Sequence, residues 1–329
     1  MNLVSAAARR LARMKFLLLA FMAGLSLLAS AQDFPARPVE MTVLFPAGSS
    51  ADVVARVLAD GMSKQLGQPV TVFNRPGAGG AIGYKWVQGQ KPDGYSIVFN
   101  SNSISTLHYS GLTPFDYHAF DPIARATIEL PVIAVKADAK WNNLKDLVAY
   151  AKQHPGELKV GNSGVGSHTH ITGMDFFHAQ QVQVTHVPFG TAQVVNTLLG
   201  GQIDAVVQLP GAIAPLVQAG NLKVLGVLAS RREPAFPNVA TAMEQGMDFK
   251  ADMWRGVAVP KGTPKPVIAR LEQAVRAAVN TPEFKAQGVK LGFTPAFQPS
   301  VEFGATVAAE DQLLSDVMER AGLKKAAAQ

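Results

Sequence analysis

The sequence predicts an α/β protein of two lobes, each built on a mainly parallel sheet flanked by helices. Strand-like apolar runs alternate with helical patterns from residue 39 onward, which favours parallel strands joined by helices. A strand, a turn of small residues and a helix occur once in each half of the chain. A strand followed by Lys, a turn and a helix occurs at 130–153 and again at 255–280, as expected where a chain crosses to a second lobe and returns. The chain has 329 residues, enough for two domains.

The first strand–turn–helix unit lies at residues 39–66. Residues 39–45 are apolar and rich in β-branched side chains, which indicates a buried strand. A turn with the sequence PAGSS follows, and Val54, Leu58 and Met62 then form the apolar stripe of a helix. The N–H groups at such a helix start attract an anion, although Asp52 in the first turn would repel one. Alone, the pattern is also that of any capped helix.

The second unit repeats this arrangement, with a strand at 158–162, a turn at 163–167 and a helix at 168–179. Its glycines allow close backbone approach, and its Asn and Ser side chains can donate hydrogen bonds. Ligands of open α/β sheets lie beyond the carboxyl ends of the strands. Two such helix starts facing each other across a cleft would hold one or two carboxylates.

The remaining elements follow the same alternation. Strands are expected at 69–74, 95–100, 182–189, 203–208 and 222–229, and helices at 81–88, 191–199, 212–218 and 298–322. Residues 100–120 are expected to form a long irregular loop. The expected division is a signal peptide at 1–31, a first lobe at 32–130 and 253–329, and a second lobe at 131–252, with the ligand cleft between the lobes.

The first 31 residues have the layout of a secretory signal peptide. Four basic residues precede the apolar run 16–29, and Ala29-Ser30-Ala31 supplies a small-residue cleavage site. Cleavage after Ala31 and export of the mature chain are therefore expected. Without these four basic residues the net charge falls from +6 to 6 − 4 = +2, which removes the main support for nucleic-acid binding. The chain has no cysteine, so thiolate metal sites and cysteine nucleophiles are excluded.

Enzyme motifs are weak throughout. The glycine-rich segment 77–83 lacks the spacing of a dinucleotide-binding loop, which indicates a structural turn, and 161–165 lacks the closing glycine of a nucleophile elbow. The histidines have no metal-ligand spacing, and His170 alone is kept as a binding candidate. A secreted α/β hydrolase would have to use Ser163 with His168 or His170. Asp52, Glu129 and Asp204 are possible acid/base groups without a readable partner.

Several short motifs, taken in their order along the chain, show a resemblance to a known protein family. The set is FPAGxxAD at 45–52, NRPGAGG at 74–80, KPDGY at 91–95, GxGSxxH at 164–170, HVPF at 186–189, LLGGQID at 198–204 and WRGVxVPxGTP at 254–264. In this the chain resembles the periplasmic solute-binding proteins of tripartite tricarboxylate transporters, the Bordetella uptake gene (Bug) family. The resemblance covers essentially the whole mature chain.

The resemblance implies a type II periplasmic binding protein, a two-lobed "Venus flytrap" that closes at a hinge on a small organic acid. It implies membrane permease subunits of the transporter as partners, a monomer, and no catalysis, cofactor, metal or nucleic acid. A sensor that presents the bound acid to a membrane kinase remains the alternative partner arrangement.

The resemblance also implies the ligand-binding residues. In the first lobe they are Phe45, Gly48, Ser49, Ser50, Ala51 and Asp52, with Ser101 and Asn102 at the end of the third strand. In the second lobe they are Asn162, Ser163, Gly164, Gly166, Ser167, His168, Phe189, Gly190 and Thr191, with Asp204 at the strand that bounds the cleft.

Two positions depart from the family pattern. Gly48-Ser49 stands where two glycines are usual after FPA, and VPFGT at 187–191 stands where VPYxG is usual. Phe189 in place of tyrosine removes a hydroxyl, which favours a more apolar carboxylate as ligand.

Overall fold

The computed structural model describes residues 34–189 and 191–325. The chain divides into two compact units, Met1–Ala36 and Arg37–Gln329, and every element described here lies in the second. The expected signal peptide and its cleavage site at Ala31 lie outside the described residues. Across the described part of the chain, no helix combines the length and apolar content needed to cross a membrane.

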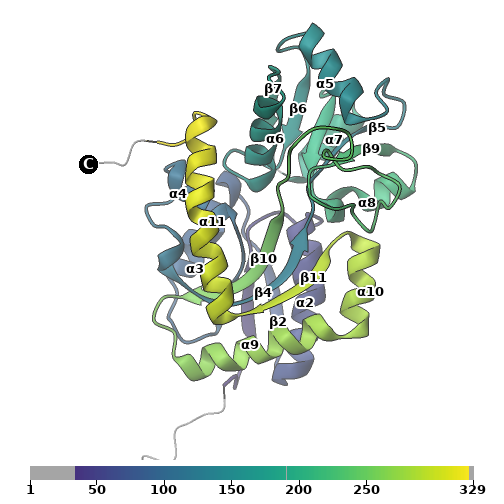
Figure 1. The fold of residues 1–329 in the computed structure, drawn as a ribbon. Helices are drawn as coiled ribbons and strands as arrows, with labels where there is room; N and C mark the ends of the chain where they lie inside the picture. The colour runs from purple at the N-terminus through teal and green to yellow at the C-terminus, as the bar shows by residue number, and fades with distance from the viewer. Residues whose placement is uncertain (1–33, 190, 326–329) are drawn as a thin grey trace, which may run out of the picture. The chain divides into compact units, whose positions relative to one another are not determined.

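The first lobe is built on a mixed sheet (Figure 1). In the described ranges its strands follow the order β11-β4-β10-β3-β1-β2. The strands are β1 (Val39–Val43), β2 (Val70–Asn74), β3 (Ser96–Ser101), β4 (Phe120–Glu129), β10 (Met253–Pro260) and β11 (Thr294–Pro299). The helices are α2 (Ser50–Leu66), α3 (Ala81–Gln88), α4 (Ser103–Tyr109), α9 (Lys265–Asn280), α10 (Pro282–Leu291) and α11 (Ser300–Arg320), with short 3₁₀ turns η1 (Ala78–Gly80) and η2 (Tyr117–Ala119).

The second lobe has a sheet of order β7-β6-β8-β5-β9 over the residues described. Its strands are β5 (Val132–Lys136), β6 (Lys159–Asn162), β7 (Thr185–Pro188), β8 (Ala205–Gln208) and β9 (Leu222–Val227). Its helices are α5 (Leu144–Gln153), α6 (His168–Ala179), α7 (Thr191–Leu199) and α8 (Pro210–Gln218). Strand β5 is buried on both faces: Ile133 and Val135 join one apolar core, and Val132 and Ala134 join another. Helices therefore cover both faces of this sheet.

The prediction of mainly parallel sheets is wrong in detail, because both sheets contain parallel and antiparallel strand pairs. The pairs β1–β2, β1–β3, β6–β7 and β6–β8 are parallel, as strands joined by helices should be. The pairs β3–β10, β4–β10, β4–β11, β5–β8 and β5–β9 are antiparallel. The antiparallel pairs all involve β4, β5 or β10, the strands that carry the chain between the sheets, so the crossings set their direction.

Residues 100–120 are not the long irregular loop that the sequence suggested. The segment forms α4 and η2, and β4 follows directly. Strand β4 went unrecognised because Pro122, Arg125 and Glu129 interrupt its apolar pattern. It leads through Pro131 into β5, so the first crossing between the sheets is nearly direct.

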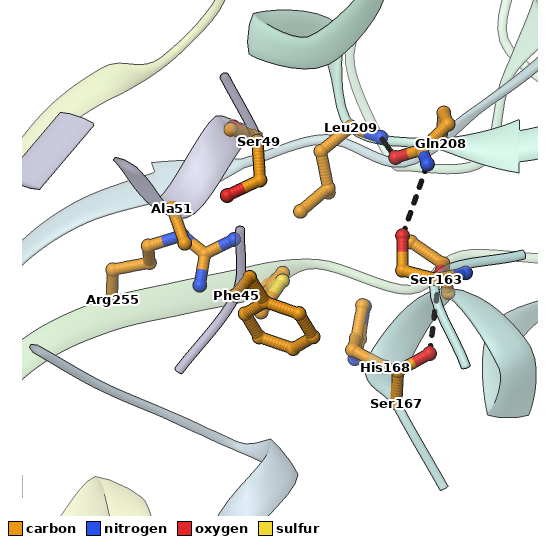
Figure 2. A pocket seen from close by; sticks show the side chains of 12 residues that line it. Phe45, Ser49, Ala51, Ser163, Ser167, His168, Gln208, Leu209 and Arg255 are labelled. Atoms are coloured by element: carbon orange, nitrogen blue, oxygen red, sulfur yellow. Dashed lines mark hydrogen bonds between the residues drawn. The ribbon is translucent and has the colours of Figure 1, made fainter. Parts of the chain in front are cut away.

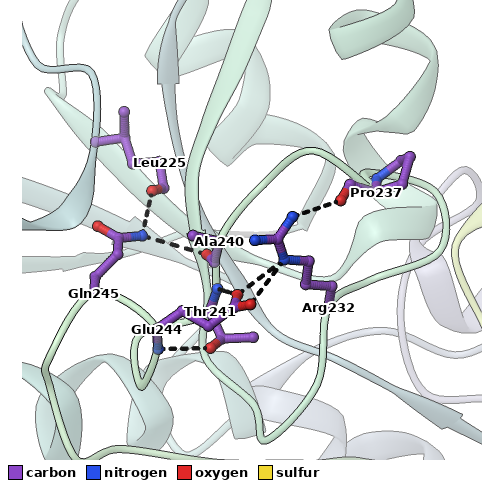
Figure 3. A network of polar contacts seen from close by, with 7 residues as sticks. All are labelled: Leu225, Arg232, Pro237, Ala240, Thr241, Glu244 and Gln245. Carbon is purple, nitrogen blue, oxygen red and sulfur yellow. Dashed lines mark hydrogen bonds and ion pairs between the residues drawn. The ribbon is translucent and has the colours of Figure 1, made fainter.

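The return segment between β9 and β10 is held by a polar network (Figure 3). Arg232 Nε donates to both carboxylate oxygens of Glu244 at 3.0 and 2.9 Å. Thr241 and Glu244 cap each other, with Thr241 N donating to Glu244 Oε2 at 2.8 Å and Glu244 N donating to Thr241 Oγ1 at 3.0 Å. Gln245 Nε2 donates to the carbonyl of Leu225 in β9 at 3.0 Å. These bonds fix a segment that has little regular secondary structure.

The same segment contains a buried acid, Glu233. Its Oε1 accepts a hydrogen bond from Ala235 N at 3.1 Å, and its Oε2 is buried without a partner in the described residues. Burial raises the pKa of Glu233 to about 7. Because the pKa of Glu233 is raised in the folded protein, its protonated form contributes its full share of stability below the unfolded pKa of about 4.5. That contribution is lost as the pH rises through about 7.

We therefore expect Glu233→Gln to stabilise the protein at pH 8 and not at pH 4.5. The gain should be about 1–2 kcal/mol, because the buried charge is removed while a buried amide is added. Urea denaturation at the two pH values measures this. Glu244→Gln is the matched control, since Arg232 lowers the pKa of Glu244 and its loss should not stabilise at pH 8. An equal effect of Glu233→Gln at both pH values would contradict the expectation.

Candidate functional site

Hydrogen bonds to Ser49 and Asp52 hold the loop between β1 and α2 in place. Ser49 caps the helix by accepting a hydrogen bond from Asp52 N at 3.3 Å, and Gly48 takes a φ of 79°, which glycine tolerates. Asp52 accepts from Gly48 N at 3.0 Å, from Asn74 Nδ2 at 2.9 Å and from Arg56 at 2.8 Å. The first N–H groups of α2, which have no partner within the helix, are thereby fixed.

Asp52 does not act as the anion-repelling group that the sequence suggested. Burial alone would raise its pKa, but the hydrogen bonds from Arg56, Gly48 N and Asn74 outweigh burial and lower it. Its charge is therefore neutralised by Arg56, and its carboxylate is turned back onto its own loop.

The loop between β6 and α6 is built the same way. Ser167 caps α6 by accepting from His170 N at 3.3 Å. Asn162 Oδ1 accepts from Gly164 N at 3.1 Å, and Ser163 N donates to Thr169 Oγ1 at 3.0 Å. His170 Nδ1 accepts from Gly166 N at 3.2 Å, so this candidate holds the loop and does not line the pocket. The start of α6 is thus fixed by its own first turn.

The two helix starts converge on one small pocket (Figure 2). Its lining residues come from both sheets: Phe45, Ser49, Ser50, Ala51, Ser163, Ser167, His168, Thr169, Gln208, Leu209, Met253 and Arg255. The cavity has a volume of about 20 Å³, space for roughly one water molecule. The pocket is therefore too small for an organic ligand, which needs its walls to separate.

Five lining residues were missed by sequence reasoning, namely Thr169, Gln208, Leu209, Met253 and Arg255, and of these Arg255 alone is charged. It is 2 % exposed and forms an ion pair with Glu129, which is 0 % exposed. Ser50 Oγ donates to the other carboxylate oxygen of Glu129. The pair lies on neighbouring antiparallel strands, where Arg255 is opposite Thr127 and Glu129 is opposite Met253. In the sequence, Glu129 was noted as a possible acid/base group and Arg255 is part of the WRG motif. No rule of residue spacing predicts that these two side chains pair.

His168 is neutral at the pocket wall. Burial, assisted by the positive charge of Arg255, lowers its pKa to about 3. Its Nε2 lies 3.2 Å from Thr172 Oγ1. The wall therefore carries no second positive charge at neutral pH.

A larger cavity of about 570 Å³ adjoins the pocket and shares Phe45 and Ser163 with it. Phe189 and Gly164 line this cavity, as does the glycine-rich segment 77–80. A Cβ on Gly79 would lie 2.4 Å from the carbonyl oxygen of Val165 in the other lobe. The glycine-rich turn expected to be purely structural thus also lines this cavity, opposite the second lobe.

Several predicted site residues lie elsewhere. Asn102 Nδ2 donates to Glu310 of α11 at 3.1 Å, and Ser101 Oγ accepts from Ser103 N at 3.3 Å, so both face the start of α4 and α11. Asp204 accepts from Lys159 N at 2.8 Å, which places it where β6 begins, at the opposite end of that strand from Ser163. Ser101, Asn102 and Asp204 therefore do not line the pocket, and the register of β8 brings Gln208 to it instead. Gly190 and the side chain of Thr191 lie outside the described part of the chain.

Ser163, the nucleophile of the hydrolase alternative, forms no hydrogen bond with His168 or His170 in the described residues. Ser163 Oγ accepts from Gln208 Nε2 at 3.0 Å, whereas the rings of His168 and His170 bond Thr172 and Gly166 N. Within the described ranges, no group of three or more His, Cys, Asp or Glu side chains could hold a metal ion. The arrangement presents hydrogen-bond donors and apolar walls, as expected of a binding site.

Comparison with known proteins places this chain in a family of receptors. The family model "Tripartite tricarboxylate transporter family receptor" matches residues 54–322. The chain is 32 % identical to protein BugT of Bordetella pertussis over 308 residues, which cover 92 % of this chain and 94 % of that protein.

Solved structures agree with the fold. The periplasmic binding protein BugD superposes with a TM-score of 0.84 at 32 % identity, over 89 % of this chain and 100 % of that one. The R. palustris protein Rpa4515, solved with adipate, gives a TM-score of 0.84 at 27 % identity, over 88 % and 99 % of the two chains. MatC from Rhodopseudomonas palustris, solved with bound malate, gives 0.80 at 28 % identity, over 86 % and 99 %. The chain therefore belongs to the tripartite tricarboxylate transporter receptors, the Bug family, and has their two-lobed periplasmic binding protein fold.

Proposed function

We propose that this protein captures a small organic acid between its lobes in the periplasm and delivers it to the permease subunits of a tripartite tricarboxylate-type transporter, without chemical change. The observation that carries the proposal is the meeting of two capped helix starts, one from each lobe, at a single pocket lined by donors. Relatives solved with malate and adipate support an acid as ligand.

The proposal includes the division of the chain. Residues 1–31 serve as a signal peptide cleaved after Ala31, residues 32–130 and 253–329 form the first lobe, and residues 131–252 form the second. The lobes hinge at the strands that link the two sheets, and the protein acts as a monomer. The small volume of the pocket supports a hinge, because a ligand must enter before the walls come together.

The proposed binding residues are those of the two helix starts together with Phe189 in the adjoining cavity. The rings of Phe45 and Phe189 line that cavity with prolines and glycines and without charged side chains. This supports an acid with an apolar portion over a highly charged one.

A thermal-shift screen of organic acids, combined with mass spectrometry of any compound that co-purifies, tests the function. A ligand present at 100 times its Kd should add about 2.7 kcal/mol to the free energy of unfolding. Recovery of the acid unchanged after prolonged incubation is expected. The proposal is overturned if no acid in a broad panel raises the melting temperature, or if the bound compound is converted.

A further inference from the structure

Arg255 is a buried charged group whose hydrogen bonds are incomplete. Its Nε donates to Glu129 Oε2, whereas its Nη1 is buried and has no partner in the described residues. Figure 2 shows the guanidinium pointing into the pocket, toward the space between Ser49 and Phe45. A buried unpaired donor is costly, and native proteins retain one where a ligand or a water completes it.

The rest of the pocket offers donors and no free carboxylate. Among the lining residues, all within the described ranges, Arg255 alone carries a charge at neutral pH. Glu129 lies behind Arg255, and its two oxygens are engaged by Ser50 Oγ and Arg255 Nε. An ammonium group in this pocket would therefore meet a positive guanidinium and find no counter-charge.

Two hydroxyl groups at the pocket, those of Ser49 and Ser163, already accept a hydrogen bond, and this orients them. Ser49 Oγ accepts from Asp52 N, and Ser163 Oγ accepts from Gln208 Nε2 at 3.0 Å. Gln208 is itself held, because its Oε1 accepts from Leu209 N at 3.0 Å. Each hydroxyl keeps its hydrogen to donate. Both hydroxyls thus add to the preference for an anion.

We propose that Arg255, oriented by Glu129, bonds the anionic group of the ligand through Nη1, and that the pocket selects acids without an amino group over the corresponding α-amino acids. This inference rests on the proposed function, since it names the ligand class of the same site. A carboxylate completes the unpaired Nη1 donor, which points into the pocket, and the two helix starts add to the stabilisation of its charge.

Isothermal titration calorimetry with matched probes tests the selectivity. The probes are succinate and aspartate, glutarate and glutamate, and 3-phenylpropanoate and phenylalanine, which differ within each pair by the amino group alone. In each pair that binds, the acid should have a Kd lower by about 10-fold or more. An amino acid that binds as tightly as its matched acid overturns the selectivity.

The double variant Glu129→Gln/Arg255→Gln tests the role of Arg255, because it removes both buried charges and leaves neither unpaired. The Kd of the tightest acid should rise by at least about 30-fold. The matched control is Arg232→Gln/Glu244→Gln, which removes an exposed Arg–Glu pair of the same kind and should leave the Kd unchanged.

The outcomes separate the two proposals. If the wild-type protein binds none of these acids nor any of a broad panel, the proposed function fails and this inference fails with it. If the wild-type protein binds an acid and the Glu129→Gln/Arg255→Gln variant binds it equally well, the assignment of Arg255 alone is overturned. If the double variant does not fold, the matched pairs on the wild-type protein still decide the selectivity.

Discussion

Arg255→Gln alone should lower the free energy of unfolding by about 3–5 kcal/mol, because it leaves the charge of Glu129 buried without its partner. Ser50 would still donate to Glu129, but one neutral hydrogen bond does not replace an ion pair in a fully buried site. Urea denaturation at pH 7, followed by circular dichroism, measures the loss.

The double variant Glu129→Gln/Arg255→Gln should recover most of that stability, since two facing amides can bond each other without a buried charge. The comparison separates the cost of an unpaired charge from the cost of lost packing around a large side chain. If the single and double variants are equally destabilised, packing and not charge accounts for the effect.

Gly79→Ala should weaken ligand binding by hindering closure of the lobes. The added Cβ would lie 2.4 Å from the carbonyl oxygen of Val165, so the closed arrangement must shift. Such overpacking costs about 1–3 kcal/mol, and only the closed state bears it, so the Kd should rise by about 5- to 150-fold. Titration calorimetry measures the Kd, and small-angle X-ray scattering measures whether ligand still makes the protein more compact.

Gly220→Ala is the matched control for this variant. Gly79 and Gly220 have similar positive φ values of 66° and 73°, so alanine should strain the backbone to a similar extent at both. A Cβ on Gly220 would meet nothing within 4 Å. Both variants should therefore lose some stability, but only Gly79→Ala should lose affinity. Equal affinities for the two variants would show that the contact between Gly79 and Val165 does not limit closure.

The two strand–turn–helix units are the part of the molecule that could be predicted best. Ser49 and Ser167 cap their helices, and the stripe Val54, Leu58 and Met62 is fully buried. Each of these features depends on residues three or four apart, and such spacing can be read along the chain. The expected helices at 81–88 and 168–179 have the observed bounds.

Other elements could not be predicted because their local patterns are mixed. Strand β4 carries Arg125 and Glu129 on a buried strand, and both find partners only in the folded protein: Arg125 donates to Ala296 of β11 at 2.8 Å. Helix α10 and strand β11 were missed as well, and β11 is only half-buried with two prolines. An edge strand of that kind has neither the alternation nor the apolar run of a typical strand.

By itself the sequence determined the fold class, the family resemblance and the two capped helix starts that meet at the pocket. The tertiary structure decided which further side chains join them. Glu129 and Arg255 are 126 residues apart, and Ser163 and Gln208 are 45 apart. Capping depends on hydrogen bonds within one helical turn, which the order of residues specifies directly. The ion pair depends on the antiparallel register of β4 and β10, and that register is fixed only when the whole sheet assembles.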